Sequence, residues 1–332
     1  MPEGHSVHRI ARQIAQNFVG REVAASSPQG RFAEGAALID GREALESRVV
    51  GKQMFVRFDG DLWLRVHLGL YGAWDFAGEI VSDPAIAASN GRMARTGRRG
   101  IASEAILDTA GENSLTSIGA PRRTRGRVRM SEQTTGLPGE DEAEWPPPVR
   151  GQVRLRLLTD LTCADLRGPT ACVIQTPEEV EQSLAKLGPD PLVDDANEGE
   201  ERVVARVRRT VTPIGLLLMD QSVVSGIGNV YRAELLFRAR LNPHTPGREV
   251  PVQTVREIWQ DWSRLLRIGV ETGQMMTRDD LSAKERRSAM ARREHRHWVY
   301  GRAGLPCRVC GTSVVVEEAA SRKLYWCPSC QA

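Results

Sequence analysis

The chain has 332 residues, of which 41% are hydrophobic, and a formal net charge of +3. This length and composition allow a sizeable buried core and predict two domains rather than one. The longest apolar runs are far shorter than the roughly 20 residues of a membrane-spanning helix, and charged residues occupy the place of a secretory signal's apolar core. Composition therefore excludes a membrane protein and predicts a cytoplasmic one.

Charge is unevenly distributed along the chain. Residues 202–332 contain 22 Lys and Arg against 12 Asp and Glu, whereas residues 1–201 contain 23 against 30. A basic C-terminal part is typical of proteins that bind a polyanion, because Arg-rich helices suit phosphate contacts. A solvated helix surface explains the same charge equally well, so charge alone does not decide.

The chain begins with a reactive sequence, Met1-Pro2-Glu3-Gly4-His5. Removal of Met1, which a small second residue permits, would leave Pro2 as a secondary amine beside the Glu3 carboxylate. A free α-amine has a pKa of about 8, so a useful fraction is unprotonated near neutral pH and can attack an electrophilic carbon. Condensation with an aldehyde carbon would give a cationic iminium, and Glu3 could move protons. Many cytosolic proteins begin in this way without being enzymes, so the rest of the chain must support the interpretation.

The N-terminal half is predicted to be rich in β-structure behind one helix. Apolar residues at helical spacing predict an amphipathic helix over residues 6–19, which would anchor Pro2 to the core. Turn signals separate the strand-like segments that follow. These predicted strands lie at 49–50, 54–58, 62–68, 71–76 and 153–161.

Residues 78–148 differ in character from the segments around them. They are small, polar and charged, with Arg clusters, an acidic stretch at 140–144 and three consecutive prolines at 146–148. Low hydrophobicity without a period predicts a disordered insertion that interrupts the sheet. A passive spacer is the preferred interpretation, and nonspecific DNA tethering is the alternative.

The second half is predicted to be helical. Residues 177–187 form a short predicted helix, with Pro177 in its first turn and Gly188 after its end. The stiff connector 188–192 and an acidic loop at 194–201 follow, and the domain boundary is placed there. Further helices are predicted at 203–211, 231–238 and 252–273.

The chain ends with the spacing of a metal site. Cys307-x2-Cys310 and Cys327-x2-Cys330 are separated by sixteen residues, as in a four-thiolate zinc ribbon. Four thiolates close a tetrahedral site, so one structural zinc ion is predicted, held by a hairpin of two strands at 314–316 and 324–326. Disulfides are the less favoured alternative in a cytosolic protein. Cys163 and Cys172 are interpreted as buried packing thiols.

Taken together, these pieces resemble the formamidopyrimidine-DNA glycosylase and endonuclease VIII family. The resemblance covers nearly the whole chain except the insertion, and it rests on the order and spacing of its motifs. The motifs are Pro2-Glu3-Gly4, Gly51-Lys52, His67-Leu68-Gly69-Leu70-Tyr71-Gly72, Leu187-Gly188-Pro189-Asp190, Asp220-Gln221 through Gly226-Ile227-Gly228-Asn229, Tyr300-Gly301-Arg302, Ser321-Arg322 and the closing Tyr325-Trp326-Cys327-Pro328-Ser329-Cys330-Gln331.

The resemblance implies roles in catalysis for four residues. Pro2 would attack C1′ of a damaged nucleoside and form a Schiff base, and Glu3 would protonate the opening sugar and later shuttle protons. Strand cleavage would follow by β- and δ-elimination. Lys52 matches the family's hairpin lysine that reaches the phosphate and sugar, and Arg322 at the tip of the zinc hairpin would grip the phosphates flanking the lesion.

The resemblance also implies DNA-binding residues. Leu70 and Tyr71 match two of three positions of the loop that fills the gap left by an extruded nucleotide in the endonuclease VIII branch. Gly69 stands where that branch usually has glutamine, which puts a direct contact with the opposite base in doubt. Asn229 matches the phosphate-contacting asparagine of a helix-two-turn-helix element, and Lys186 falls where the branch has an arginine.

The expected fold is α+β, in three parts. Residues 1–188 would form a catalytic β-sandwich domain with a long N-terminal helix, residues 189–296 a helical helix-two-turn-helix domain, and residues 297–332 a four-cysteine β-hairpin zinc finger. Expected partners are zinc and damaged double-stranded DNA, bound by a monomeric enzyme that would be nucleoid-associated if bacterial.

Three alternatives remain at this point. The chain could be a non-enzymatic DNA-binding module that uses the basic helices and the zinc ribbon, although this leaves Pro2, Glu3 and Lys52 unexplained. It could be a lyase confined to abasic sites, with no base release. It could also prefer oxidised purines, whereas Leu70 and Tyr71 favour oxidised pyrimidines.

Overall fold

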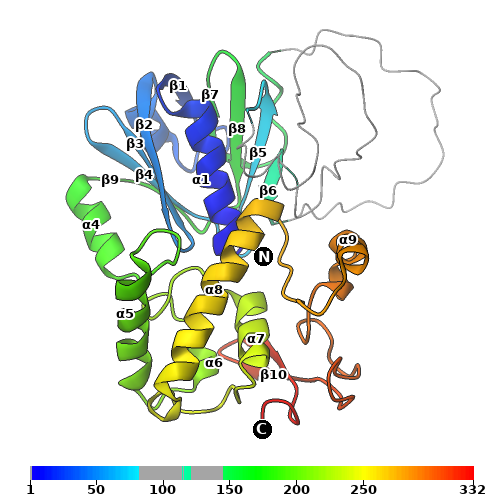
Figure 1. Cartoon of the computed structure of the whole chain (residues 1–332). Coiled ribbons are helices and arrows are strands. Elements are labelled where there is room, and N and C mark those ends of the chain that lie inside the picture. The colour runs from blue at the N-terminus through cyan, green and yellow to red at the C-terminus, as the bar shows by residue number, and fades with distance from the viewer. Residues whose placement is uncertain (1, 82–113, 115, 121–144) are drawn as a thin grey trace, which may run out of the picture.

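The computed structural model describes residues 2–81, 114, 116–120 and 145–332. A β-sheet domain and a helical domain pack end to end, and the N-terminus lies where they meet (Figure 1). The predicted fold class is therefore confirmed.

The N-terminal domain is built on antiparallel strands whose order is β6-β5-β8-β7-β1-β2-β3-β4-β9. Strand β1 joins two halves of this sheet, because its first residues pair with β2 and its last residues pair with β7. The strands are β1 (Arg21–Ser26), β2 (Arg42–Val50), β3 (Gln53–Phe58), β4 (Leu62–His67), β5 (Ala73–Gly78), β6 (Ser117–Gly119), β7 (Val153–Leu158), β8 (Thr162–Arg167) and β9 (Ala171–Gln175).

Helix α1 (Gly4–Phe18) confirms the predicted N-terminal helix and packs across this sheet. Its apolar face, which includes Ile10, Ile14 and Phe18, is buried in the same cluster as side chains from both halves of the sheet. Burial of this face fixes the first turn of α1, and with it Pro2 and Glu3, at the end of the sheet domain that meets the helical domain (Figure 1). A short helix, α2 (Ala33–Ile39), connects β1 and β2.

Most of the predicted insertion, residues 78–148, lies outside the described residues. Within the described part, Ser117–Gly119 forms strand β6, which pairs with β5. Sequence analysis did not predict this strand. Its one apolar residue, Ile118, is buried in the main core of the domain, and a three-residue strand carries too little periodicity to be recognised.

The helical domain confirms three of the predicted helices and corrects one boundary. Helix α5 begins at Ala196, inside the segment predicted to be an acidic loop, because the Asp195 side chain caps it by accepting from the amides of Asn197 and Glu198. Acidic residues in the first turn stabilise a helix. The negative charge of this segment, which favoured a loop, therefore belongs to the beginning of α5. The helices are α4 (Pro177–Ala185), α5 (Ala196–Arg208), α6 (Ile214–Leu217), α7 (Asn229–Arg238), α8 (Val252–Thr272) and α9 (Ala283–Ala291), with 3-10 turns at Gly247–Glu249 and Arg293–His295.

The C-terminal hairpin pairs β10 (Val315–Ala319) with β11 (Arg322–Trp326). Its tip residues, Ala320 and Ser321, both have positive φ, as a two-residue turn between right-twisted strands requires. This turn places Arg322 at the tip of the hairpin. None of the helices in the described part of the chain is both long enough and apolar enough to cross a membrane.

Candidate active site

The Glu3 carboxylate is the centre of the site. It is 1% exposed, and it accepts hydrogen bonds from the amides of Gly228 (3.1 Å), Val230 (2.9 Å) and Tyr231 (3.3 Å) at the start of α7. These amides have no partner within their own helix, and the positive end of the helix dipole favours an anion there. A residue of the sheet domain thus caps a helix of the other domain, which fixes Glu3 and its neighbour Pro2, also buried, at the junction.

Lys52 faces Glu3 from the turn between β2 and β3. Its Nζ atom donates to the carbonyl oxygen of Ile227 at 2.6 Å. Burial lowers the pKa of Lys52 to about 8, although the Glu3 carboxylate opposes this effect, and Arg322 adds to it. Burial raises the pKa of Glu3, while Lys52 and the α7 amides lower it. Electrostatics therefore couple three of the predicted residues, Glu3, Lys52 and Arg322, in one site.

Close backbone packing around these residues depends on glycine. The Gly4 amide donates to the carbonyl oxygen of Gly226 at 2.9 Å. Gly51 has a φ of +59°, and a Cβ added to it would lie 2.6 Å from the Cβ of Ser225. A Cβ added to Gly228 would lie 2.4 Å from Cδ of Glu3. Side chains at these positions would push the two domains apart at the site.

The turn between β4 and β5 carries the predicted gap-filling residues. Tyr71 is 78% exposed and Leu70 is partly exposed, so neither is an ordinary core residue. The Nδ1 atom of His67, at the end of β4, donates to the carbonyl oxygen of Lys52 at 3.0 Å. This hydrogen bond ties the turn to the backbone beside Lys52. Gly69 has a φ of +65°, which favours glycine and is consistent with the departure from the branch's glutamine.

Asn229, the first residue of α7, holds the zinc hairpin. Its Nδ2 atom donates to the carbonyl oxygen of Lys323 at 2.8 Å, next to Arg322. The fully buried Arg232 bonds both Asn229 Oδ1 and the same carbonyl, and sequence analysis did not single it out. Lys186 lies apart: it is the exposed C-cap of α4, and within the described residues no hydrogen bond or ion pair joins it to this group.

The four C-terminal cysteines fit a zinc ion. Their Sγ atoms all lie within 4.8 Å of one another, and the pairs Cys307–Cys330 and Cys310–Cys327 are 3.9 and 3.5 Å apart. Tetrahedral zinc with Zn–S bonds of about 2.3 Å requires sulfur separations of about 3.8 Å. The four thiolates are therefore positioned to bind one structural zinc ion, which would fasten the base of the hairpin. Cys163 and Cys172 are buried in the sheet domain, as predicted.

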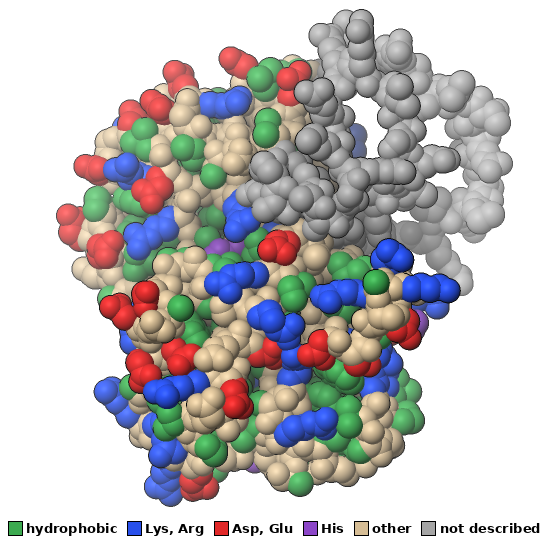
Figure 2. Space-filling model, in the orientation of Figure 1, with side chains coloured by type: hydrophobic (Ala, Val, Ile, Leu, Met, Phe, Trp, Pro, Cys, Tyr) green, Lys and Arg blue, Asp and Glu red, His purple; other side chains and the backbone are tan. Residues whose placement is uncertain are grey.

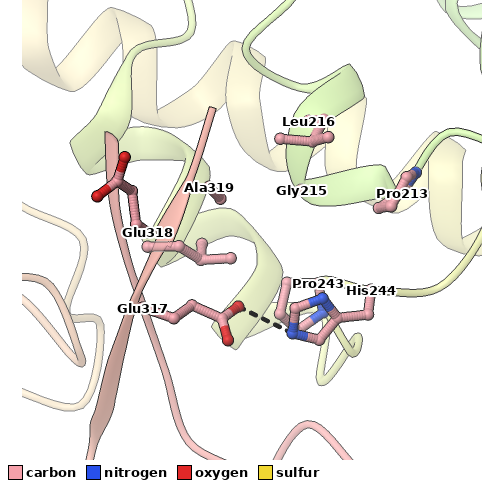
Figure 3. Close-up of a pocket in the computed structure, with 9 residues that line it drawn as sticks. Pro213, Gly215, Leu216, Pro243, His244, Glu317, Glu318 and Ala319 are labelled. Carbon is pink, nitrogen blue, oxygen red and sulfur yellow. Dashed lines mark ion pairs between the residues drawn. The ribbon is translucent and has the colours of Figure 1, made fainter. Parts of the chain in front are cut away.

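A pocket of about 180 Å³ lies between the β10–β11 hairpin and the helical domain (Figure 3). Across it, His244 Nε2 and Glu317 Oε1 are 2.8 Å apart. The Gln331 side chain donates to the carbonyl oxygen of Leu241 at 3.0 Å. These contacts attach the C-terminal zinc finger to the helical domain. None of the predicted site residues lines the pocket.

The surface over the junction is mixed in charge. Figure 2 shows Lys and Arg side chains along the line where the domains meet and over the helical half, with Asp and Glu side chains among them. The excess of basic residues in the C-terminal part is therefore partly offset locally. Arg238, for example, pairs with Asp261 at 2.5 Å and with Asp279 at 2.8 Å.

Comparisons with known families and proteins account for this arrangement. Residues 1–172 match the formamidopyrimidine-DNA glycosylase N-terminal domain, residues 187–280 the formamidopyrimidine-DNA glycosylase H2TH domain, and residues 304–332 a zinc finger found in FPG and IleRS. The chain belongs to the formamidopyrimidine-DNA glycosylase and endonuclease VIII family. It is accordingly a DNA glycosylase and AP lyase of base excision repair.

Relatives show where the chain lies within the family. It is 34% identical over 343 residues to a Mycobacterium tuberculosis (strain H37Rv) protein named Endonuclease 8 1, with 100% of both chains covered. It is 37% identical over 149 residues to a formamidopyrimidine-DNA glycosylase of Thermus thermophilus, covering 45% of this chain and 54% of that one. The full-length likeness is thus to a protein named as an endonuclease 8.

Solved structures share the fold. An FPG mutant of Lactococcus lactis, in complex with Fapy-dG-containing DNA, has a TM-score of 0.67 at 16% identity, with 99% of both chains covered. The MutM (FPG) protein of Thermus thermophilus has a TM-score of 0.62 at 21% identity, covering 99% of this chain and 98% of that chain.

Proposed function

We propose that Pro2, freed by removal of Met1, is the nucleophile that attacks C1′ of a damaged nucleotide. The observation that carries the proposal is the fixed position of Glu3, whose carboxylate is locked to the start of α7 within the electrostatic reach of Lys52. Pro2 is covalently next to this carboxylate. The terminal amine and its proton-transfer partner therefore stay together at the domain junction.

The proposed reaction begins at the Pro2 nitrogen. The Pro2 nitrogen bonds to C1′ as the glycosidic bond breaks, and the amine proton leaves with the departing base. The C1′–O4′ bond then breaks, O4′ takes a proton from Glu3, and an iminium forms between Pro2 and C1′. Loss of a C2′ proton to Glu3 lets the C3′–O bond break, which expels the 3′ phosphate. Loss of a C4′ proton to water then lets the C5′–O bond break, which expels the 5′ phosphate, and hydrolysis of the iminium frees Pro2.

Burial supports the role of Glu3 as the proton donor. Because burial raises the pKa of Glu3, the carboxyl holds a proton at a higher pH than an exposed glutamate does. Transfer of that proton leaves a carboxylate that three amides and the Lys52 ammonium stabilise. The same group can then accept the C2′ proton.

We assign the phosphate contacts to Lys52, Arg322, Asn229 and Lys186. The first two are electrostatically coupled across the site, and Asn229 holds the hairpin strand beside Arg322. The exposed position of Lys186 is compatible with a contact to the DNA backbone away from the reacting sugar. The DNA bound in this way is damaged duplex.

The proposed lesions are oxidised pyrimidines. Tyr71 and Leu70 project from a tight turn next to Lys52, as residues that fill the gap left by an extruded nucleotide must do. Full-length likeness to a protein named Endonuclease 8 1 supports the same branch. We further propose that the enzyme acts as a cytoplasmic monomer, nucleoid-associated if bacterial, with domains 1–188, 189–296 and 297–332. Separate buried clusters in the sheet domain and the helical domain support the first boundary. The cluster of the zinc region also includes Ala233 and Phe237 of α7, so the zinc finger packs directly on the helical domain.

Borohydride trapping tests the proposal. Untagged protein and a Pro2→Gly variant are incubated with duplexes that carry either dihydrouracil or an abasic site. A wild-type adduct on the dihydrouracil duplex, lost or strongly weakened in the variant, is the expected result. An adduct on the abasic duplex alone would limit the enzyme to lyase chemistry, and equal adducts from both proteins would remove Pro2 as the nucleophile.

A further inference from the structure

A buried carboxylate beside the site joins three segments of the chain. Asp190 follows α4 in the connector between the domains and is fully buried. Its Oδ2 atom accepts hydrogen bonds from the Gly51 amide at 2.6 Å and from His8 Nε2 at 2.8 Å. Its Oδ1 atom accepts from the Leu192 amide at 2.9 Å. One side chain thus links α1, the turn before Lys52 and the connector.

His8 is the side chain that holds this carboxylate. It lies on α1 and is 4% exposed, and its Nε2 atom acts as the donor to the Asp190 oxygen. The other nearby acid, Asp194, accepts from the Asp190 amide at 2.7 Å and is itself paired with Arg202 at 2.9 Å. Because a buried carboxylate that loses a donor is strongly disfavoured, Asp190 depends on His8 to keep its orientation.

The Gly51 amide that Asp190 binds directly precedes Lys52. Gly51 sits in a left-handed conformation against Ser225 and Gly226, with no room for a side chain. Two hydrogen bonds of Lys52 itself also hold the turn. Its Nζ atom donates to the carbonyl oxygen of Ile227, and its own carbonyl oxygen accepts from His67. The hydrogen bond from the Gly51 amide to Asp190 is therefore the third contact that holds the turn. It is the contact that depends on His8.

We infer that His8 is a positioning residue: through Asp190 and the Gly51 amide it sets where the Lys52 ammonium stands relative to Glu3 and Pro2. This inference rests on the proposed role of Lys52. His8 itself touches neither substrate nor reacting atoms, and its effect on cleavage passes entirely through Lys52.

The experiment compares variants in single-turnover cleavage of an abasic duplex, with DNA affinity measured separately. His8→Leu removes the donor and is expected to lower the cleavage rate by about 10- to 100-fold, the effect of misplacing a catalytic group by about 1 Å. His8→Gln places an amide nitrogen where Nε2 stands and should restore most of the rate. The Asn side chain of His8→Asn is too short to reach Asp190, so this variant should show the same loss of cleavage rate. It replaces His8→Leu in the test if the apolar variant does not fold.

Two controls separate positioning from loss of stability. Val7→Ala removes core volume from the same helix turn and should lower the melting temperature without lowering the cleavage rate. In a Lys52→Met background, His8→Leu should cause no further loss, because effects that act through one group are not additive. An equal loss in both backgrounds, a loss matched by Val7→Ala, or a wild-type rate for His8→Leu and His8→Asn would each overturn the inference.

Trapping with the wild-type protein keeps the two proposals distinguishable. If wild type forms no borohydride adduct, the proposed function fails regardless of His8. If wild type forms the adduct and the variants contradict the pattern above, only the role of His8 fails.

Discussion

Gly228→Ala isolates the importance of where Glu3 stands. Gly228 has φ −118° and ψ −162°, an extended conformation that alanine adopts without strain, so the substitution changes only the space beside it. The added Cβ would lie 2.4 Å from Glu3 Cδ, whereas ordinary contact begins at 3.4 Å. The carboxyl must therefore move by about 1 Å, enough to cost on the order of 100-fold in rate when a reacting group is misplaced.

The same displacement predicts a moderate loss of stability. Overpacking of this kind costs about 1–3 kcal/mol, and weaker bonds from the amides of Gly228, Val230 and Tyr231 add to it. Thermal unfolding measures this part, and single-turnover cleavage of an abasic duplex measures the catalytic part. Gly199→Ala serves as the matched control, because its Cβ would lie 2.7 Å from the Trp259 ring in the core of the helical domain, and neither Glu3 nor its amide donors are among the nearest atoms.

A double variant identifies the route of the effect. If Gly228→Ala acts by moving Glu3, it should cause no further loss in a Glu3→Gln background. Wild-type cleavage by a folded Gly228→Ala protein would refute the requirement for a fixed Glu3. A full additional loss in the Glu3→Gln background would show that the glycine acts through something else.

Five further predictions concern Lys52, the zinc site, Arg322, Tyr71 and the N-terminal amine. The Lys52 pKa of about 8 predicts that affinity for duplex DNA falls as pH rises through that value, because the ammonium loses its charge. Lys52→Arg stays charged and should abolish this fall, so a pH profile that is the same in both proteins would contradict the prediction. Zinc removal by a chelator should abolish DNA nicking, because the β10–β11 hairpin loses the metal that holds its base. Arg322→Ala should impair DNA binding and nicking while zinc content and melting temperature stay unchanged. Normal nicking by that folded variant would remove Arg322 from the site. Tyr71→Ala should leave stability within about 0.5 kcal/mol because the ring is 78% exposed, yet reduce cleavage at a base lesion; equal cleavage would argue against gap filling. An uncleaved N-terminal tag should abolish lyase activity, and a tagged protein that still forms the borohydride adduct would exclude the Pro2 amine.

Local sequence was sufficient for elements whose signal is short-range. The amphipathic period behind Glu3 predicted α1, and the two Cys-x2-Cys pairs predicted the zinc hairpin, because periodicity and metal-ligand spacing depend only on neighbouring residues. Where two local signals compete, the prediction was wrong. The acidic composition of residues 194–201 predicts a loop, but the Asp195 cap makes this segment the start of α5.

Sequence motifs also identified Pro2, Glu3, Lys52, Asn229 and Arg322 as candidates, since each stands in a recognisable short pattern. They did not show how these residues meet. The distance from Glu3 to Gly228 along the chain is 225 residues, yet their atoms are 3.1 Å apart. No local pattern encodes such a contact, because it is produced by the packing of one domain on another.

The chemical groups available to this protein follow from the order of its residues: a terminal proline next to a glutamate, a hairpin lysine, and four thiolates with zinc spacing. Folding adds three features that residue order does not contain: α7 presents the amides of its first turn to Glu3, burial shifts the pKa values of Glu3 and Lys52, and His8 reaches Asp190 beside the Lys52 turn. Desolvation and helix-end electrostatics depend on which surfaces are brought together, and those surfaces lie far apart in the chain.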